Sequence, residues 1–595
     1  MGFLAPKLPR RFDVQLWHLN PRMERIKPLV KHWAESGFGT PWSAYLVYLA
    51  KIAGYIGGAL LFIRATPGIG PLSDIAHWWT EPVVLQKAVI WTLLFEVVGF
   101  GCGFGPLTLR FLPPVGGPLY WLRPGTIRLP PFPGRVPLTR GTHRTVVDGL
   151  LYLGLLAAAV WALLSPTSVM DTGLFGPAYI LDPARLIPLA VLVPLVGLRD
   201  KTIFLAARAE HTWVALLALL LPFLDMIVAV KVLTVLIWLG AAISKMNRLF
   251  PFAVSVMLSN SPLFPKPLKR RLYRRFPRDM RPSALAKTIA HGGTTVEFVA
   301  PLVLLVSTDR WLTLAAVVAM VLFHLHILAS LPLGVPLEWN VFMLFSLVYL
   351  FWGYFPYQPA TAAHPWFLAV LAVPVLAMVA WGNLRPDKVS FLLAMRYYAG
   401  NWATSMWSLQ PSAIEKIDKN VAKWCGFAKS QLRKIYGEQV AEVLAHKVLT
   451  FRAMHHHGRG LFALLPLAAG AENDDHLVLE GELVAGGLLG WNFGEGHLHN
   501  EQLIAALQER CHFEPGEVRV VLLEARPAGS DRQEYRLVDA ATGEFDRGFL
   551  MVSDLVERQP WEVADLPVYS SNPLGPPAEP EPEQRVPEAT RVDAA

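Results

Sequence analysis

The stretch from Asp225 to Lys245 reads DMIVAVKVLTVLIWLGAAISK, and it decides the fold. Its length matches the ~20 residues that a helix needs to cross the ~30 Å hydrocarbon core of a bilayer. Comparable apolar stretches recur through the first two thirds of the chain. Across all 595 residues, 53% are hydrophobic and 17% are charged, which is outside the composition of ordinary soluble proteins. The sequence therefore predicts an α-helical polytopic membrane protein.

The apolar stretches predict about ten spans. The turn between residues 222 and 225 is very short, so residues 203–245 form either two spans or one long broken helix. With two spans counted there, the predicted spans lie near residues 43–64, 82–103, 146–165, 184–198, 203–223, 225–245, 286–306, 312–331, 339–356 and 365–383.

Lysine and arginine alternate between the loops, and loops rich in these residues stay in the cytoplasm. Loops 65–81 and 166–183 contain neither residue, whereas loops 104–145 and 248–285 contain many. This pattern predicts a multi-pass protein of the cell membrane with both termini in the cytoplasm. The net charge of +8 lies mostly in these loops, so we expect a lipid bilayer as the partner and no nucleic acid.

Composition divides the chain into five parts. We expect a basic cytoplasmic N-terminal segment, a transmembrane helical bundle, an amphipathic interfacial segment, a small soluble α+β domain and a disordered tail. Their boundaries are residues 1–42, 43–384, 385–435, 436–571 and 572–595. The tail is rich in Pro and Glu and cannot bury a core.

Four ionisable residues inside predicted spans are candidates for a site: Asp225, Lys245, Glu297 and His324. A charge near the centre of a bilayer costs at least ~2.5 kcal/mol, so such residues face the bundle interior or a wet cavity. Each has a structural alternative. Lys245 ends a span and could extend to the lipid headgroups, and Glu297 follows two glycines that allow close helix packing.

Two stretches carry a resemblance to a known family. Residues 238–247 read WLGAAISKMN and residues 323–326 read FHLH. Both resemble the horizontally transferred transmembrane domain that includes the vitamin K-dependent gamma-carboxylases. The whole chain is also similar to an uncharacterised actinobacterial family of multi-spanning transmembrane proteins, through residues 250–252 (FPF) and 257–262 (MLSNSP).

The carboxylase resemblance implies a chemistry for two of the candidates. The matching lysine falls on Lys245 and would be the base that deprotonates a reduced quinone. His324 would then donate a hydrogen bond to a developing oxyanion. Carboxylases carry a large extracytoplasmic region that binds a peptide, whereas this soluble module is small and predicted to be cytoplasmic, so protein glutamate carboxylation is not implied.

Histidines gather in two short runs of the predicted soluble module. His455, His497 and His499 are candidate metal ligands, because neutral imidazoles together with a carboxylate suit zinc or iron. Against this, the consecutive residues His455 to His457 cannot all point to one ion. Docking of a protein partner or of a small ligand is an equally open role for the module.

Two functions follow from these observations. The first is an integral membrane enzyme that acts on a lipid-soluble substrate, such as a quinol or a polyprenyl or acyl lipid, with a buried lysine as the base. The alternative is a non-enzymatic scaffold or transport-associated subunit whose cytoplasmic module docks partners. The sequence identifies no cofactor; the resemblance alone suggests a quinone.

Overall fold

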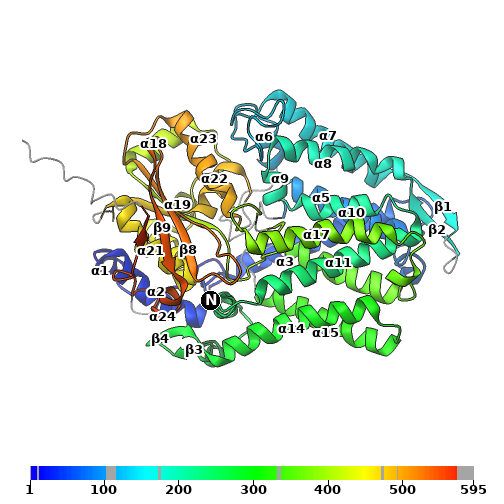
Figure 1. Cartoon of the computed structure of the whole chain (residues 1–595), viewed down its shortest axis with the longest axis horizontal. Helices are drawn as coiled ribbons and strands as arrows, with labels where there is room; N and C mark the ends of the chain where they lie inside the picture. Colours follow the sequence, from blue (N-terminus) through cyan, green and yellow to red (C-terminus); the bar gives the residue numbers. More distant parts are fainter. Residues whose placement is uncertain are drawn as a thin grey trace, which may run out of the picture.

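The computed structural model describes residues 2–9, 12–101, 116–171, 176–330, 337–390, 392–470, 473, 475–491 and 494–571. A helical bundle stands beside a module that contains a β-sheet, and the N-terminal helices pack on the module side (Figure 1). The predicted disordered tail, 572–595, lies outside the described residues.

Six of the described helices are long and apolar enough to cross a membrane. They are α3 (Trp42–Arg64), α7 (Val146–Leu164), α11 (Phe223–Lys245), α14 (Ala284–Val306), α15 (Arg310–Ser330) and α17 (Trp366–Leu384). Each coincides with a predicted span, so a multi-pass helical bundle is confirmed.

Ten spans are not confirmed, because the other four predicted spans form shorter or interrupted helices. These are α5 (Pro82–Val97), α8 (Ile187–Arg199), α10 (Ala209–Ala218) after the short α9 (Thr202–Leu205), and α16 (Leu337–Ser346) continued by the π-helical η3 (Leu347–Gly353). At 1.5 Å per residue, the 16 residues of α5 span about 24 Å, which is less than the bilayer core.

The chain reverses direction between α10 and α11. His211, at the start of α10, bonds the hydroxyl of Tyr397, and Ser244, at the end of α11, donates to the Ala394 carbonyl at 3.2 Å. One short segment, 394–397, therefore contacts the first turn of one helix and the last turn of the next. Residues 203–245 thus fold back on themselves and do not form one long broken helix.

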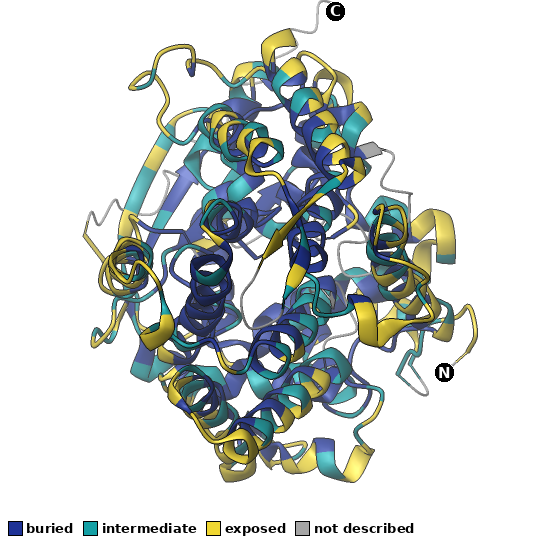
Figure 2. Cartoon of the chain, turned by 90° about the vertical axis from the view of Figure 1, so that its right-hand side faces the viewer, coloured by how far each residue is buried: buried dark blue, intermediate teal, exposed yellow. Residues whose placement is uncertain are grey.

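Burial separates the inner from the outer helices (Figure 2). In the most apolar 18-residue stretch of each helix, 89% of α11 is buried, compared with 22% of α3 and 17% of α17. The outer helices expose large apolar side chains, such as Leu49 and Leu61 on α3 and Val370 and Val373 on α17. Soluble monomers rarely expose apolar surface of this extent, whereas helices that face lipid do.

Tertiary contacts gather the basic loops at the module end of the bundle. Helix α12 (Phe250–Asn260) of the most basic loop packs against α2 (Arg22–Ser36), and α9 contacts η5 (Gly496–Leu498) of the module. At the opposite end, the hairpin of β1 (Thr167–Asp171) and β2 (Pro177–Leu181) packs against α5. The N-terminal helices and the module therefore share the basic end.

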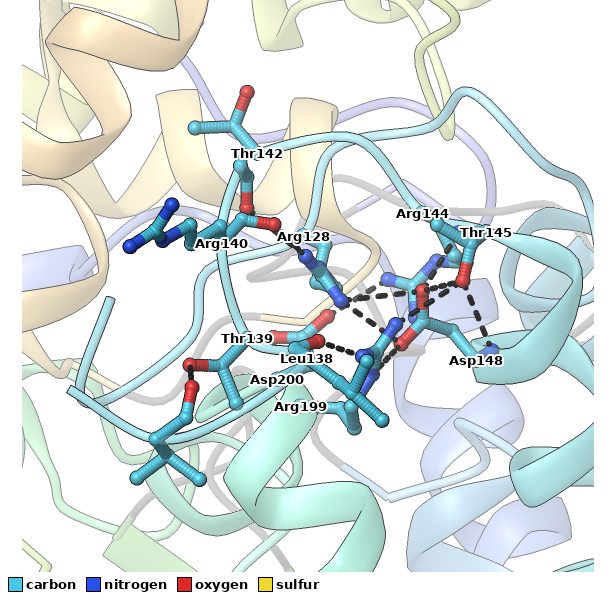
Figure 3. A network of polar contacts seen from close by, with 12 residues as sticks. Arg128, Leu138, Thr139, Arg140, Thr142, Arg144, Thr145, Asp148, Arg199 and Asp200 are labelled. Atoms are coloured by element: carbon cyan, nitrogen blue, oxygen red, sulfur yellow. Dashed lines mark hydrogen bonds and ion pairs between the residues drawn. The ribbon is translucent and has the colours of Figure 1, made fainter. Parts of the chain in front are cut away.

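Several of the basic residues that define this end are nonetheless buried in ion pairs (Figure 3). Arg128 bonds Asp148 at 3.2 Å, and Arg144 bonds Asp200 at 2.8 Å. Asp148 also accepts from Arg199 Nε at 2.6 Å. These arginines therefore hold the loop before α7 onto α7 and α8, besides contributing positive charge to this side.

The module is built on a six-stranded antiparallel sheet with the order β10-β9-β8-β7-β5-β6. Its strands are β5 (Thr404–Leu409), β6 (Leu477–Glu480), β7 (Val518–Leu523), β8 (Arg532–Asp539), β9 (Gly543–Met551) and β10 (Tyr569–Ser570). Strand β5 is buried along its whole length between β6 and β7. It lies within residues 385–435, for which an interfacial segment is predicted, so the sheet begins before residue 436.

The remaining described elements belong to the N-terminal segment, the loops of the bundle and the module. They are α1 (Val14–His18), α4 (Ile75–Trp78), α6 (Gly116–Trp121), η2 (Pro183–Arg185), α13 (Lys266–Arg271), β3 (Tyr273–Arg275), β4 (Asp279–Pro282), η4 (Pro359–Thr361), α18 (Pro411–Asn420), α19 (Ala428–Tyr436), α20 (Glu438–Met454), α21 (His456–Ala469), α22 (Gly481–Leu489), α23 (Glu501–Cys511) and α24 (Val552–Glu557).

Candidate functional site

A cavity of about 330 Å³ opens between α11, α12, α14, α15 and α16 at the module end of the bundle. Its wall is mostly apolar, with a few polar groups among aliphatic and aromatic side chains, which is typical of sites for small apolar ligands. The lining includes Arg208, Trp238, Ala241, Lys245, Phe250, Ala253, Met257, Gly293, Glu297, Phe323, His324, Trp339, Asn340, Tyr397 and Tyr398.

Lys245 and Glu297 form an ion pair in the cavity wall. The Lys245 Nζ lies 2.7 Å from Glu297 Oε1 and 2.6 Å from Oε2, and the side chains are 11% and 5% exposed. Lys245 therefore does not extend to the headgroups. A paired ammonium has no lone pair, so Lys245 must first pass a proton to Glu297 before it can act as a base.

His324 also lines the cavity, but both of its ring nitrogens are engaged. The Trp238 Nε1–H donates to His324 Nε2 at 3.0 Å, and His324 Nδ1 lies 3.0 Å from Asn340 Oδ1. Because the indole nitrogen is only a donor, Nε2 accepts and Nδ1 carries the proton of a neutral ring. A hydrogen bond from His324 to an oxyanion, as the carboxylase resemblance implies, requires the Nδ1–H to leave Asn340.

Asp225 lies at the other end of α11 and is not part of the cavity. It accepts from the backbone N–H of Ala363 at 2.8 Å and contacts His364 Nδ1 at 2.7 Å. Twenty residues of α-helix separate it from Lys245, which corresponds to about 30 Å. Asp225 therefore anchors the loop before α17. The structure brings Lys245, Glu297 and His324 together and leaves Asp225 apart.

Arg208 lines the cavity from within the predicted span 203–223, so it carries the same signal as the four candidates, a charge inside a span. Its guanidinium contacts the carboxylates of Glu96 and Glu338, and Glu338 also pairs with Lys51 Nζ at 3.2 Å. All four side chains are at most 3% exposed. Glu96 is recognisable from the sequence as a charge within a span. The other three members of this group, Arg208, Glu338 and Lys51, come from three other segments of the chain and share no sequence motif with Glu96.

Tyr397 and Tyr398 close the cavity on the module side. Tyr397 bonds His211, and Tyr398 packs on Trp402 with ring centroids 5.7 Å apart. Trp402 in turn packs on His457 at 4.6 Å and His455 at 5.6 Å. The segment before β5 therefore connects the cavity to the histidine run of the module.

The histidine run at the start of α21 is completely buried. His455, His456 and His457 are each at most 1% exposed, and burial lowers the pKa of His455 to about 3. Arg452 precedes them and pairs with Glu482 at 2.8 Å and with Glu480. Arg459 follows them and lies over the Phe252 ring at 4.9 Å. Burial, and then the charge of Arg281, lower the Arg459 pKa to about 9.

The three candidate metal ligands do not come together. His455 Nδ1 bonds the Phe451 carbonyl at 2.8 Å, and His499 Nδ1 bonds Ser405 Oγ at 2.6 Å. His497 lies 3.4 Å from Glu524 Oε1; burial opposes protonation, but Glu524 and then Glu495 raise the His497 pKa. In the part of the chain that the structure describes, no group of three or more His, Cys, Asp or Glu side chains is placed to hold a metal ion.

Comparison with known proteins identifies the family and supplies no activity. No curated protein and no solved structure matches the chain. The resemblance to gamma-carboxylases and to an actinobacterial family gains no support from these comparisons. The family described as a transmembrane protein of unknown function (DUF3556) matches residues 1–571. With nearly the whole sequence matched and a multi-pass helical bundle in the structure, this chain belongs to the DUF3556 family of transmembrane proteins.

Proposed function

We propose that this protein is a membrane enzyme that takes a lipid-soluble molecule with one polar group into the cavity and acts on it at the Lys245–Glu297 pair. One observation carries the proposal: an apolar cavity of about 330 Å³ has a buried ion pair in its wall. A reduced quinone, a polyprenyl lipid and an acyl lipid all combine a long apolar part with one polar or acidic group. The apolar part would pack against the aliphatic and aromatic walls.

The reaction class that fits the pair is proton transfer. A proton that moves from Lys245 Nζ to a Glu297 oxygen, over 2.6 Å, leaves a neutral amine beside a neutral carboxyl group. The amine then accepts a proton from the polar group of the substrate, which becomes an anion next to the ammonium. Arg208 lines the same cavity, where Glu96 and Glu338 hold its guanidinium in place and, with Lys51, balance its charge. We place the module and both termini in the cytoplasm, because the basic loops share their end of the bundle.

To test this, a larger side chain is introduced to fill the cavity, and the lipid that stays bound to the purified protein is measured. A Cβ at Gly293 would lie 3.6 Å from Phe323, so a larger side chain there enters the cavity, whereas Gly292 on the same helix has open space around it. We expect mass spectrometry of wild-type protein purified in mild detergent to find one enriched lipid-soluble species. Gly293→Leu should lose most of it, by about tenfold or more, and Gly292→Leu should retain it.

Two results would contradict this proposal. One is the absence of any species enriched above the bulk lipid. The other is equal retention by Gly293→Leu and Gly292→Leu, which would favour the scaffold alternative. If a species is found, incubation of Lys245→Met with it should show binding without turnover.

A further inference from the structure

A second cavity, of about 720 Å³, lies in the module and is lined by many basic side chains. The N-terminal helices α1 and α2 form one wall, and α18, α19, α20 and β6 form the others. Six arginine and lysine residues line it: Arg22, Arg25, Lys423, Lys429, Arg433 and Lys434. We call it the basic cavity; its wall has no residue in common with that of the cavity at Lys245.

The carboxylates of the basic cavity do not balance these charges. Among the described residues, the wall contains the carboxylates of Asp418, Glu442 and Asp475, against the six cations. Asp418 pairs with Lys423, and Glu438, from outside the wall, pairs with Arg433 at 3.0 Å. Glu442 is shared by Lys429 at 2.5 Å, His446 at 3.2 Å and Arg25 at 3.9 Å. Burial lowers the pKa of His446 to about 4, so this histidine is neutral at pH 7 and adds no charge. An excess of positive charge therefore remains around one cavity.

Two of the six basic side chains, those of Arg22 and Arg25, are also buried, unlike those of a solvated surface. Arg22 is 8% exposed and donates to the Asn473 carbonyl at 2.7 Å, and Arg25 is 4% exposed. The Trp17 indole donates to the Arg25 carbonyl at 2.9 Å. The Arg22 guanidinium is thus held in the wall by a hydrogen bond, and the Arg25 guanidinium is buried beside Glu442.

We infer that the basic cavity binds a small molecule that carries phosphate groups, with its phosphates among the six cations. Arginine and lysine around a concave wall match phosphate oxygens through charge-assisted hydrogen bonds. Apolar residues in the same wall, including Ile414 and Phe427, supply a surface for a less polar part of the ligand. The volume is within the ~300–1,000 Å³ of small-molecule sites.

The test uses the full chain in nanodiscs of neutral phosphatidylcholine, with inorganic pyrophosphate and ATP as probes in calorimetry. We expect saturable binding of at least one probe. Lys429→Gln should weaken it by about tenfold, and Lys434→Gln, an exposed position, by about fivefold. Lys419→Gln, also exposed but outside the wall, should change it less than twofold.

Two outcomes would overturn this inference. The first is that neither probe binds saturably at millimolar concentration. The second is that Lys434→Gln and Lys419→Gln weaken binding equally, which would mean that the probes are attracted by the general positive charge of the surface. Nanodiscs of phosphatidylglycerol identify the source of the phosphate. Weaker pyrophosphate binding in them means that lipid headgroups compete for the cavity, and unchanged binding means that the ligand is free in solution. The lipid experiment on Gly293 does not depend on either result.

Discussion

Replacement of Glu297 by leucine is expected to lower the free energy of unfolding by about 3–5 kcal/mol, because it leaves the Lys245 ammonium buried without its partner. Lys245→Met should cost a similar amount, since it strands the Glu297 carboxylate. The double variant should recover most of the loss, because it removes both charges and fills the space with apolar groups. Equilibrium unfolding of detergent-solubilised protein measures the free energy of unfolding of all three variants.

A surface pair provides the matched control for this cycle. Arg270 Nε bonds Glu35 at 2.8 Å, but Arg270 is half exposed. Arg270→Gln should therefore cost less than about 1 kcal/mol. If Glu297→Leu were as mild as Arg270→Gln, or if the double variant were the least stable of the three, the pair would not be a buried one.

Gly458→Ala is expected to prevent folding, with a loss of more than about 4 kcal/mol. The added Cβ would lie 1.8 Å from the Arg452 carbonyl oxygen, which is backbone and cannot turn aside. Helix α21 could then no longer cross the last turn of α20, and the buried run from His455 to Arg459 would separate from Trp402. Yield of folded protein and its thermal unfolding measure the effect.

Gly460, two residues further along α21, is the control for this prediction. A Cβ there would lie 2.9 Å from Leu550 Cδ1, the end of a flexible side chain. Gly460→Ala should therefore cost no more than about 2 kcal/mol. Similar losses for Gly458→Ala and Gly460→Ala would contradict the close crossing of the two helices.

The sequence predicts the bundle well because bilayer thickness fixes the length of an apolar helix. It also indicates one buried face of α11, since Lys231, Trp238 and Lys245 recur at seven-residue spacing, and all three are buried. The predicted span 225–245 already places Asp225 and Lys245 at opposite ends of one helix, about 30 Å apart, so the sequence alone argues against placing them in one site. Distance along the helix axis, and not the helical face, separates Asp225 from Lys245.

Long-range pairing limits what the sequence reveals about the module. Strand β5 pairs with β6 and β7, which lie far along the chain, and its sequence TSMWSL has no strong alternation. The histidines at 455–457 suggest a metal site because the sequence shows the residue type and its spacing. The sequence does not show that these side chains are buried. Arg208 is recognisable as a charge inside the predicted span 203–223, but its pairing could not be predicted, because its partners Glu96 and Glu338 come from separate helices.

A density map of wild-type protein purified in mild detergent tests the central claim most directly. We expect elongated density in the cavity between α11, α14 and α15, with its polar end in contact with Lys245 or Glu297. A cavity that is closed by repacked side chains, or one that contains no density while the ion pair is intact, would contradict the claim that this bundle holds a lipid-soluble substrate.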